Sequence, residues 1–415
     1  KGSSREASPY AELCAGIHLV FAENIDRIYQ QNCHNLGLLT CTDMSVLEQM
    51  ISGEVVSLEA FTRGKDPVTT QIIEWGGLFE FNLARIQGKV DLPGPQSGSG
   101  PQTITQKIFA SHRVVDSSTY EVGGETAVVG DAGFFATDLR FSHEYVTPMA
   151  ATFFEEKVGK GEPLNDPESI ILFRDHLTFL EQAMTPERKK MGLLNTAEQL
   201  KIKQQDFADT YDLTLHGETE HGGSEAICHS KILQDYAEPG NLIIGSDSHT
   251  PHSGAIGCVA FGVGTTAIFN SWITRDVYSL VPESVKVVVS GQRPDGVTAK
   301  DMMLAILRTP YVADGHAIGK MVEYCGEAVR DLSIDERATM TNMAAEVGAF
   351  SGIVCADEKT VECRVAEGGM DDAHARELCV GLESDEGAEY CHEIVIDAES
   401  LEPLVALPGD PGNGL

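Results

Sequence analysis

The sequence has 415 residues, of which 42% are hydrophobic and 22% are charged, a balance typical of globular proteins and not of disordered ones. Lys and Arg number 30 against 63 Asp and Glu, and the resulting formal net charge of −33 disfavours nucleic-acid backbones and anionic membrane surfaces as partners. No apolar run reaches the roughly 18 residues that a membrane-spanning helix needs.

The first part of the chain mixes helical and strand-like patterns. Residues 11–20 predict a helix that runs into a strand, and residues 25–32 have the spacing of a helix. Residues 55–61, together with residues 72–81, predict further strands and a helix.

A segment rich in Pro, Gly and Ser follows, from Asp91 to Thr103, and it predicts a flexible connection between domains. Beyond it, apolar strand-like runs alternate with helical patterns. The runs are residues 126–129, 242–244 and 285–289, and the helical patterns are residues 299–307 and 340–347. This alternation predicts an α/β architecture.

The ten cysteines are scattered along the chain, and no C-x-x-C pair occurs among them. A zinc ribbon or a thioredoxin-like site is therefore not expected. Free thiols in apolar or mixed runs behave as small hydrophobic residues, which favours a reducing, cytoplasmic compartment over a secreted disulfide scaffold.

Several histidines lie near acids within apolar surroundings. Asp175 and His176 are adjacent, His229 follows an apolar pair, and Asp247 and His249 are two residues apart after the run 242–244; Glu323 also has apolar neighbours. A carboxylate beside an imidazole fixes its tautomer and raises its basicity, as proton transfer near neutral pH requires. Each group taken alone is more often a hydrogen-bonded core histidine or a surface acid, but their joint occurrence favours a catalytic site.

Two further hypotheses concern ligands. His229, Asp247 and His249 could bind zinc or iron as two histidines and a carboxylate, although their spacing matches no specific zinc motif. The N-terminal segment GSSRE, residues 2–6, combines a glycine, two hydroxyls and an arginine whose fork suits a carboxylate. From these five letters alone, an N-cap followed by a surface arginine is the favoured interpretation.

The stretch GSDSHTPHSGAIGCVAFGVGT, residues 245–265, resembles the aconitase superfamily, which includes aconitase, homoaconitase and 3-isopropylmalate dehydratase. Residues 227–250, 297–307, 322–329 and 341–354 are similar to further segments of that family. GSSRE, continued by residues 21–39, resembles the family's small swivelling domain. This domain comes first here, as in fused dehydratase-like proteins, which points to the dehydratase branch.

The resemblance implies an aconitase-like fold, with three-layer α/β/α core domains and a smaller swivelling β/β/α domain. The implied division is a partial swivelling domain over residues 1–91, a linker over 92–103 and a large-subunit-like core over 104–415. The implied activity is that of a hydro-lyase, which removes water from a hydroxy di- or tricarboxylic acid and adds it back at the neighbouring carbon. The implied cofactor of the complete protein is a 4Fe–4S cluster that binds the substrate as a Lewis acid.

The resemblance also assigns roles to residues. Ser4 matches the family's base, which takes the proton from carbon, while Ser3 and Arg5 match groups that support this base and bind a carboxylate. Ser248 matches a substrate contact. The implied acid–histidine pairs are Asp175 with His176, His229 with Asp247, and His249 with Glu323.

The chain departs from the family pattern in three respects. None of its ten cysteines stands in the context of the family's cluster ligands, so these ligands are expected beyond residue 415, in a longer polypeptide of which this chain is a part. Ala7 replaces a common His, and Met149 stands where a substrate-binding Gln is common. The last two changes leave the identity of the substrate open.

We therefore weigh several functions. The leading hypothesis is a dehydratase of the isopropylmalate type, in the cytoplasm and without nucleic-acid or membrane partners. An aconitase or homoaconitase type, acting on citrate, homocitrate or a methylated malate, is the close alternative. A cluster-free RNA-binding relative is disfavoured by the charge of −33, and a metal hydrolase remains open. The same charge repels an anionic substrate, which would need a local basic pocket.

Overall fold

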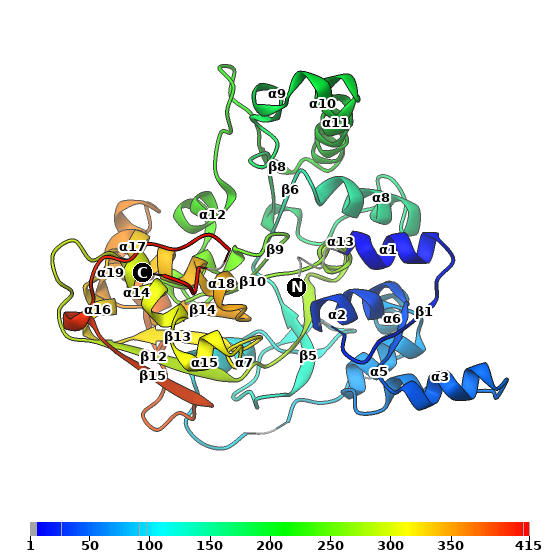
Figure 1. The fold of residues 1–415 in the computed structure, drawn as a ribbon, viewed down its shortest axis with the longest axis horizontal. Coiled ribbons are helices and arrows are strands. Elements are labelled where there is room, and N and C mark those ends of the chain that lie inside the picture. Colours follow the sequence, from blue (N-terminus) through cyan, green and yellow to red (C-terminus); the bar gives the residue numbers. More distant parts are fainter. Residues whose placement is uncertain (1–5, 26, 91, 97, 410, 415) are drawn as a thin grey trace.

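Two parallel sheets form the centre of this computed structural model, which describes residues 6–25, 27–90, 92–96, 98–409 and 411–414 (Figure 1). The first sheet has the order β10-β9-β6-β7-β8. Its strands are β6 (Leu139–His143), β7 (Ile170–Phe173), β8 (Thr214–His216), β9 (Leu242–Gly245) and β10 (Val259–Gly262), and all neighbours run parallel. The second sheet, also parallel, has the order β14-β13-β12-β15. Its strands are β12 (Ser284–Ser290), β13 (Met321–Cys325), β14 (Ser351–Val354) and β15 (His392–Asp397).

The first sheet is covered on both faces because successive side chains of a strand point to opposite sides. Leu172 and Ile244 pack into one core, and Ile171 and Ile243 pack into another. The first core is closed by α8 (Thr147–Lys157), α11 (Leu193–Tyr211) and α13 (Thr265–Thr274). The second is closed by α12 (Cys228–Lys231), the 3-10 helix Thr250–Ile256 and α17 (Ile334–Asn342). These layers confirm the predicted α/β architecture.

The second sheet has its own core, in which Val285, Val287 and Val289 pack against methionines of α14 (Ala299–Leu307). Helices α15 (Pro310–Ala313), α16 (Glu327–Asp331) and α18 (Ala344–Val347) lie around it. Helices α19 (Glu358–Ala366) and α20 (Asp372–Cys379) follow in the chain, and β15 returns to the sheet edge beside β12.

The N-terminal part is mainly helical and gathers on the right of Figure 1. It contains α1 (Ala7–Cys14), α2 (Arg27–Leu36), α3 (Met44–Ile51), α4 (Glu59–Thr62), α5 (Pro67–Glu74) and α6 (Leu78–Ile86), with a parallel pair of strands, β1 (Leu19–Phe21) and β2 (Leu39–Cys41). A buried ion pair joins it to the rest: Arg85 on α6 donates to both oxygens of Asp276, at 2.9 and 2.8 Å. The division into domains at residues 91 and 103 stays a prediction.

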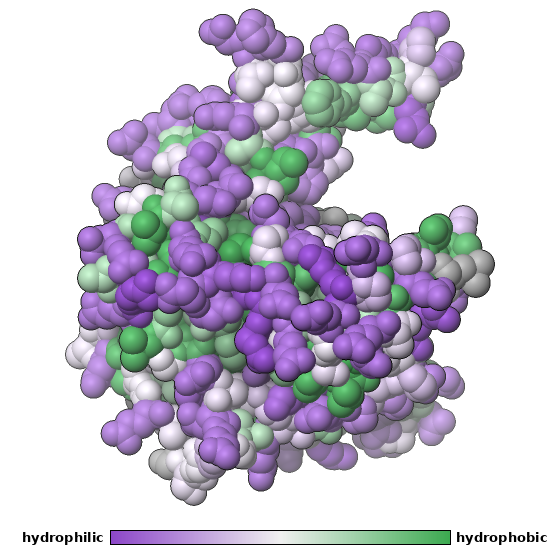
Figure 2. Space-filling model, turned by 90° about the vertical axis from the view of Figure 1, so that its left-hand side faces the viewer, coloured by the Kyte–Doolittle hydropathy of each residue, from purple (hydrophilic) through white to green (hydrophobic). Residues whose placement is uncertain are grey.

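Further elements lie outside the two central sheets. They are α7 (Ile104–Ser111), β3 (Val114–Asp116), β4 (Glu121–Val122), α9 (Leu180–Ala183) and α10 (Pro186–Lys190), with the antiparallel pair β5 (Ala132–Ala136) and β11 (Asp276–Leu280). Helices α9, α10 and α11 project at the top of Figure 1, and Figure 2 shows a hollow beneath this projection and a mainly hydrophilic face. No helix among the described residues is both long enough and apolar enough to span a membrane.

Some predicted elements are confirmed and others are wrong. The strands at 242–244 and 285–289 and the helix at 299–307 are present as β9, β12 and α14. Residues 126–129 form no strand, because the backbone of Ala127 bonds to the side chains of Gln102 and Gln106 instead of a neighbouring strand.

The N-terminal strands predicted near residues 55–61 and 72–81 are also wrong, since helices α4, α5 and α6 occupy these regions. The helix predicted over 340–347 breaks at Met343 into α17 and α18.

The proline- and glycine-rich segment differs from a freely flexible connection. Its described residues form neither helix nor strand, but they are held against the body. The Gln96 N–H donates to Asp131 at 3.2 Å, the Gly98 N–H to Thr126 at 3.2 Å and the Gln102 N–H to Asp385 at 2.8 Å.

Candidate active site

The polar groups of the site follow neighbouring strands of the first sheet at the point where each strand ends. His143 and Glu144 close β6, Asp175 and His176 follow β7, and Asp247 follows β9. These strands are adjacent and parallel in the order β9-β6-β7, so their carboxyl ends meet at one edge. Ligands of open α/β sheets commonly bind at such an edge.

Asp247 is the centre of this cluster. Its Oδ1 lies 3.0 Å from Nε2 of His229 and accepts the backbone N–H of His249 at 2.9 Å. Its Oδ2 lies 3.3 Å from Nε2 of His176, and Nε2 of His143 lies 3.9 Å away. The residue is 8% exposed, so the burial of its charge is offset by histidines on both sides.

The cluster shifts the pKa values of its members. Burial opposes ionisation of Asp247, but hydrogen bonds from His176, His229 and His249 hold its pKa far below the usual range. Hydrogen bonds to Asp175 and Asp247 raise the pKa of His176 to about 10, and those to Asp247 and Glu346 raise the pKa of His249 to about 9. Perturbed values of this kind concentrate at catalytic sites.

The Asp175–His176 pair has the predicted geometry. Oδ1 of Asp175 lies 2.8 Å from Nδ1 of His176, and its Oδ2 accepts the backbone N–H of Cys228 at 2.8 Å. Burial raises and these bonds lower the pKa of Asp175, which settles at about 2. The carboxylate thus stays ionised and fixes the His176 ring, whose Nε2 faces Asp247.

The expected pairing of His249 with Glu323 is wrong in this structure. Nε2 of His249 lies 3.2 Å from Glu346 on α18. Glu323 lies within β13 of the second sheet, where it accepts hydrogen bonds from Ser384 at 2.7 Å and Tyr390 at 2.9 Å. These bonds hold Glu323 in the second sheet, whereas His249 is paired with Glu346. Any catalytic role of Glu323 stays a prediction.

Sequence reasoning missed His143 and Glu144, which are both fully buried. The His143 ring stacks on that of His176, with centroids 3.9 Å apart. Glu144 accepts the backbone N–H groups of His176 at 2.7 Å and Leu177 at 2.5 Å, so it fixes the turn that presents His176. Asp247 was predicted because polar residues follow an apolar strand there. The same pattern at the end of β6 could have predicted His143 and Glu144.

The serines and the arginine of the predicted N-terminal site, Ser3, Ser4 and Arg5, lie outside the described residues. Ser248 is exposed, with its hydroxyl 3.2 Å from Nδ1 of His249. Met149 lies in α8 and packs against the first core, so in this structure its side chain contributes to packing.

The side chains present decide whether the chain fits a metal ion or a cluster. In the described part of the chain, one group of potential ligands comes together, His143, Glu144 and His176, with ligand atoms within 4.8 Å of one another. The hypothesised set of His229, Asp247 and His249 is instead joined by hydrogen bonds. All ten cysteines are free thiols, and no three of them gather among the described residues, so the chain does not itself fit an iron–sulfur cluster.

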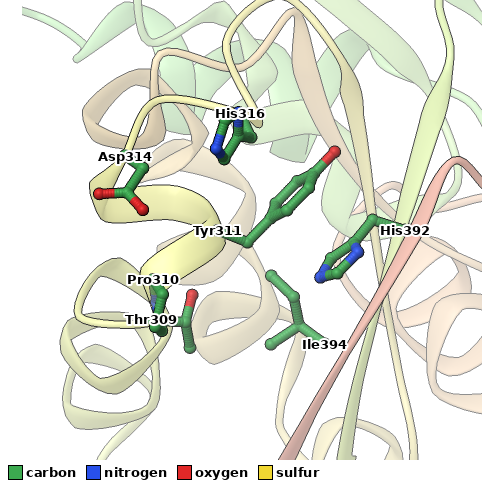
Figure 3. Close-up of a pocket in the computed structure, with 7 residues that line it drawn as sticks. All are labelled: Thr309, Pro310, Tyr311, Asp314, His316, His392 and Ile394. Carbon is green, nitrogen blue, oxygen red and sulfur yellow. The ribbon is translucent and has the colours of Figure 1, made fainter.

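Two cavities are notable. One, of about 450 Å³, shares Glu346 with the site and is lined by His252, Lys300, Leu304, Thr339, Asn342, Met343, Glu346, Ala406 and Pro411. The other, of about 390 Å³, is lined by Tyr311, His392, His316 and their neighbours, with the Tyr311 and His392 rings stacked at 3.7 Å (Figure 3). It shares no lining residue with the acid–histidine cluster.

Comparisons with known proteins bear on the family of this chain. The model of the aconitase family, described as aconitate hydratase, matches residues 106–415. The 3-isopropylmalate dehydratase large subunit of Aliarcobacter butzleri is 35% identical over 314 residues, which cover 75% of this chain and 67% of that protein. Large subunit 1 of Pyrococcus furiosus is 34% identical over 315 residues, which cover 76% of this chain and 66% of that protein. The chain thus covers about two thirds of the length of these relatives.

Proposed function

This chain belongs to the aconitase family, a family of hydro-lyases, and we propose that it supplies the acid–base residues of a reversible dehydration of the 3-isopropylmalate dehydratase type. The family prediction made from the motifs is confirmed over residues 106–415. The observation that supports the proposal best is the buried Asp247 carboxylate, which holds His176, His229 and His249 around one point.

The proposed reaction takes a hydroxy di- or tricarboxylic acid to an unsaturated acid and water. A base removes a proton from one carbon, the C–O bond of the neighbouring carbon breaks, and a histidine protonates the departing hydroxyl as water leaves. Rehydration reverses these steps with the hydroxyl on the other carbon. General acids and bases must lie within hydrogen-bond reach of the proton that they move.

The histidines of the cluster suit the acid role. His176 and His249 are held protonated near neutral pH by the carboxylates of Asp175, Asp247 and Glu346. His249 is the more accessible of the two, since 36% of its side chain is exposed against 29% for His176. We assign the base to Ser4, which the family motif places in GSSRE. We assign support of this base and carboxylate binding to Ser3 and Arg5, and a substrate contact to Ser248.

The cofactor of the complete protein is proposed to be a 4Fe–4S cluster, as in the family. The described cysteines do not gather into a set that fits it, and we propose that its ligands lie in sequence outside this chain. We further propose that residues 1–91 act as the swivelling domain and that the Arg85–Asp276 ion pair docks this domain. The remainder of the enzyme is proposed as a partner of this chain.

The compartment is proposed to be the cytoplasm, because ten free thiols suit a reducing environment. The substrate is proposed to be an isopropylmalate-like acid, since both relatives described above are named for that reaction. Citrate, homocitrate and methylated malates are the alternatives.

The test uses the full-length protein, reconstituted anaerobically with iron and sulfide. Each acid is added in turn, and the ultraviolet absorbance of the unsaturated product is followed. A rise with one acid supports the proposal and identifies the substrate. No rise with any acid, with iron and acid-labile sulfide both present, would refute the proposed reaction.

A further inference from the structure

The start of the second sheet carries a cluster of nucleophilic and titratable side chains, whereas the acid–histidine cluster lies on the first sheet. Nζ of Lys320, the residue before β13, donates to Sγ of Cys391 at 3.4 Å and to the Tyr311 hydroxyl at 3.2 Å. The Tyr311 hydroxyl lies 3.9 Å from the same sulfur. Both the backbone N–H and the thiol of Cys391 donate to the Ser284 carbonyl, at 2.9 and 3.2 Å. The thiol therefore lies where β12 and β15 begin.

Lys320 is the cation of this cluster. Its Nζ also lies 3.1 Å from the carboxylate of Glu283. Burial opposes the charge of Lys320, but hydrogen bonds with Tyr311, Glu283 and Cys391 outweigh burial and raise its pKa. An ammonium group has three N–H donors, and these three partners are a hydroxyl, a carboxylate and a sulfur. The positive charge is thus held against the thiol.

Cys391 combines two properties that the other described cysteines do not share. Reactive thiols are accessible and lie in electropositive surroundings. Cys391 is exposed and bonded to Lys320. Cys14 is also exposed, but no lysine or arginine among the described residues bonds to it. Cys363 receives an N–H from Arg364 at 3.6 Å, but it is half-buried, and burial raises the pKa of its thiol.

We propose that Cys391 is a site of reversible oxidation by hydroperoxides, in which the Lys320 ammonium stabilises the attacking sulfur and the departing oxygen. The sulfur attacks one oxygen of hydrogen peroxide, so that an S–O bond forms and the O–O bond breaks. The departing hydroxide takes the thiol proton and leaves as water. The sulfur loses two electrons, the peroxide gains them, and the product is a sulfenic acid, which thiols reduce again.

The surroundings of Cys391 favour a sulfenic acid over an internal disulfide. Cys325 ends β13 and Cys355 follows β14, at the opposite end of the sheet from Cys391, which precedes β15. Tyr311 and His392, the neighbours of Cys391 in space and in sequence, line the cavity of about 390 Å³ shown in Figure 3. A small peroxide therefore has room beside the exposed sulfur. This chemistry uses none of the residues of the proposed dehydration.

The test measures modification of the thiol and not turnover. Wild type, Lys320→Met, Lys320→Gln, Lys320→Arg and the control Lys190→Met are prepared in the full-length protein. Each is exposed to limiting hydrogen peroxide with dimedone, which traps sulfenic acids, and peptide mass spectrometry follows the labelling of each cysteine. Lys190 is an exposed lysine of α10, so its loss changes the net charge equally.

Two cysteines serve as internal references. Labelling of Cys391 is divided by that of Cys14 in the same molecules, which cancels differences in the dose of peroxide. Cys258 is fully buried, so its labelling reports unfolding.

We expect Cys391 to be labelled about 3- to 10-fold faster than Cys14 in wild type, between the effects of a buried and an exposed charged hydrogen bond. Both neutral variants of Lys320 should bring this ratio close to one. Lys320→Arg should keep most of it, because it keeps the charge, and Lys190→Met should keep all of it.

A ratio close to one in wild type would overturn the proposal. So would an unchanged ratio in Lys320→Met or Lys320→Gln while Cys258 stays unlabelled, because the cation would then contribute nothing to the reactivity of the thiol.

Discussion

The Glu6 carboxylate accepts hydrogen bonds from both the backbone N–H of Thr266, at 2.8 Å, and its hydroxyl, across 260 residues of sequence. Glu6 is 4% exposed and lies at the first turn of α13, where the positive end of the helix favours a carboxylate. This contact ties the end of the GSSRE segment to the helix that follows β10.

Gly264 leaves the room that this contact needs. A Cβ at Gly264 would lie 2.4 Å from Oε2 of Glu6 and 2.8 Å from Oδ1 of Asn32. Gly264→Ala should therefore displace the carboxylate and destabilise the protein by about 1–3 kcal/mol, the usual cost of overpacking. Chemical denaturation measures this, with Gly217→Ala as the control, because nothing lies within 4 Å of a Cβ there.

A double-mutant cycle separates the carboxylate from a general backbone effect. If Glu6→Ala makes room for the new methyl group, the double variant loses less stability than the sum of the single losses. Additive losses would mean that the methyl group added by Gly264→Ala destabilises the protein through contacts other than the one with Glu6.

Gly262 has a corresponding role at Asp247. A Cβ at Gly262 would lie 2.5 Å from the backbone oxygen of Asp247, a group that cannot rotate away. Gly262→Ala should displace Asp247 from its histidines and lower turnover by at least about 10-fold, since small misplacements of catalytic groups are costly. The rates of this variant and of Gly217→Ala are compared; equal rates would show that the strand end tolerates the shift.

The sequence predicted the groups whose partners are close along the chain or in a strong motif. Asp175 and His176 are adjacent, and Asp247 follows an apolar strand within the DSHT motif, so the pairs could be anticipated. The partner of His249 could not, because Glu346 lies 97 residues away and its approach depends on how α18 packs. Neither composition nor periodicity encodes that packing.

The secondary structure shows the same limit. The fully buried strand β9 was predictable from a short apolar run, whereas residues 126–129 have a similar run and form none. Their backbone groups are satisfied by the side chains of Gln102 and Gln106, which is a tertiary effect. Likewise, the helices at 67–86 contain β-branched residues, which favour strands in isolation. Packing against α2 and α13 outweighs that local preference.

Glu144 should contribute to the folding stability of the protein, although its carboxylate does not reach Asp247. Both of its oxygens accept backbone N–H groups of residues 175–177. Glu144→Gln replaces an acceptor oxygen by an NH₂ group that faces these donors, so we expect about 1–3 kcal/mol of destabilisation from unsatisfied buried groups. Thermal and chemical denaturation would reveal it, and Glu181→Gln on the exposed helix α9 is the control. Wild-type stability of Glu144→Gln would contradict this assignment.

Asp247→Asn should remove the charge that holds the histidines. Turnover should fall by about 10²–10⁴-fold, the range of a lost acid–base contribution. Because Asp247 is a leading cause of their raised pKa values, His176 and His249 should titrate at lower pH in the variant, which NMR of the imidazole protons can follow. Asp235→Asn, which removes a surface carboxylate paired with Lys231, is the control. A normal rate with unchanged histidine titration would remove Asp247 from the centre of the site.

The same histidines should make the folding stability depend on pH in a defined direction. The pKa values of His176 and His249 are raised to about 10 and about 9 from 6.5, so the native state binds more protons than the unfolded state above pH 6.5. Stability falls with pH wherever the native state holds the extra protons. Their contribution is therefore fully present below pH 6.5, declines above it and is lost as pH rises through 9 to 10.

We expect the free energy of unfolding to fall with pH more steeply in wild type than in the double variant His176→Asn and His249→Asn. Urea denaturation at intervals between pH 6.5 and 8.5 measures both slopes, and the difference between the two proteins removes the contribution of the thiols, which is the same in both. Parallel slopes would mean that neither histidine holds its extra proton in the native state, and the acid role assigned to them would have to pass to another group.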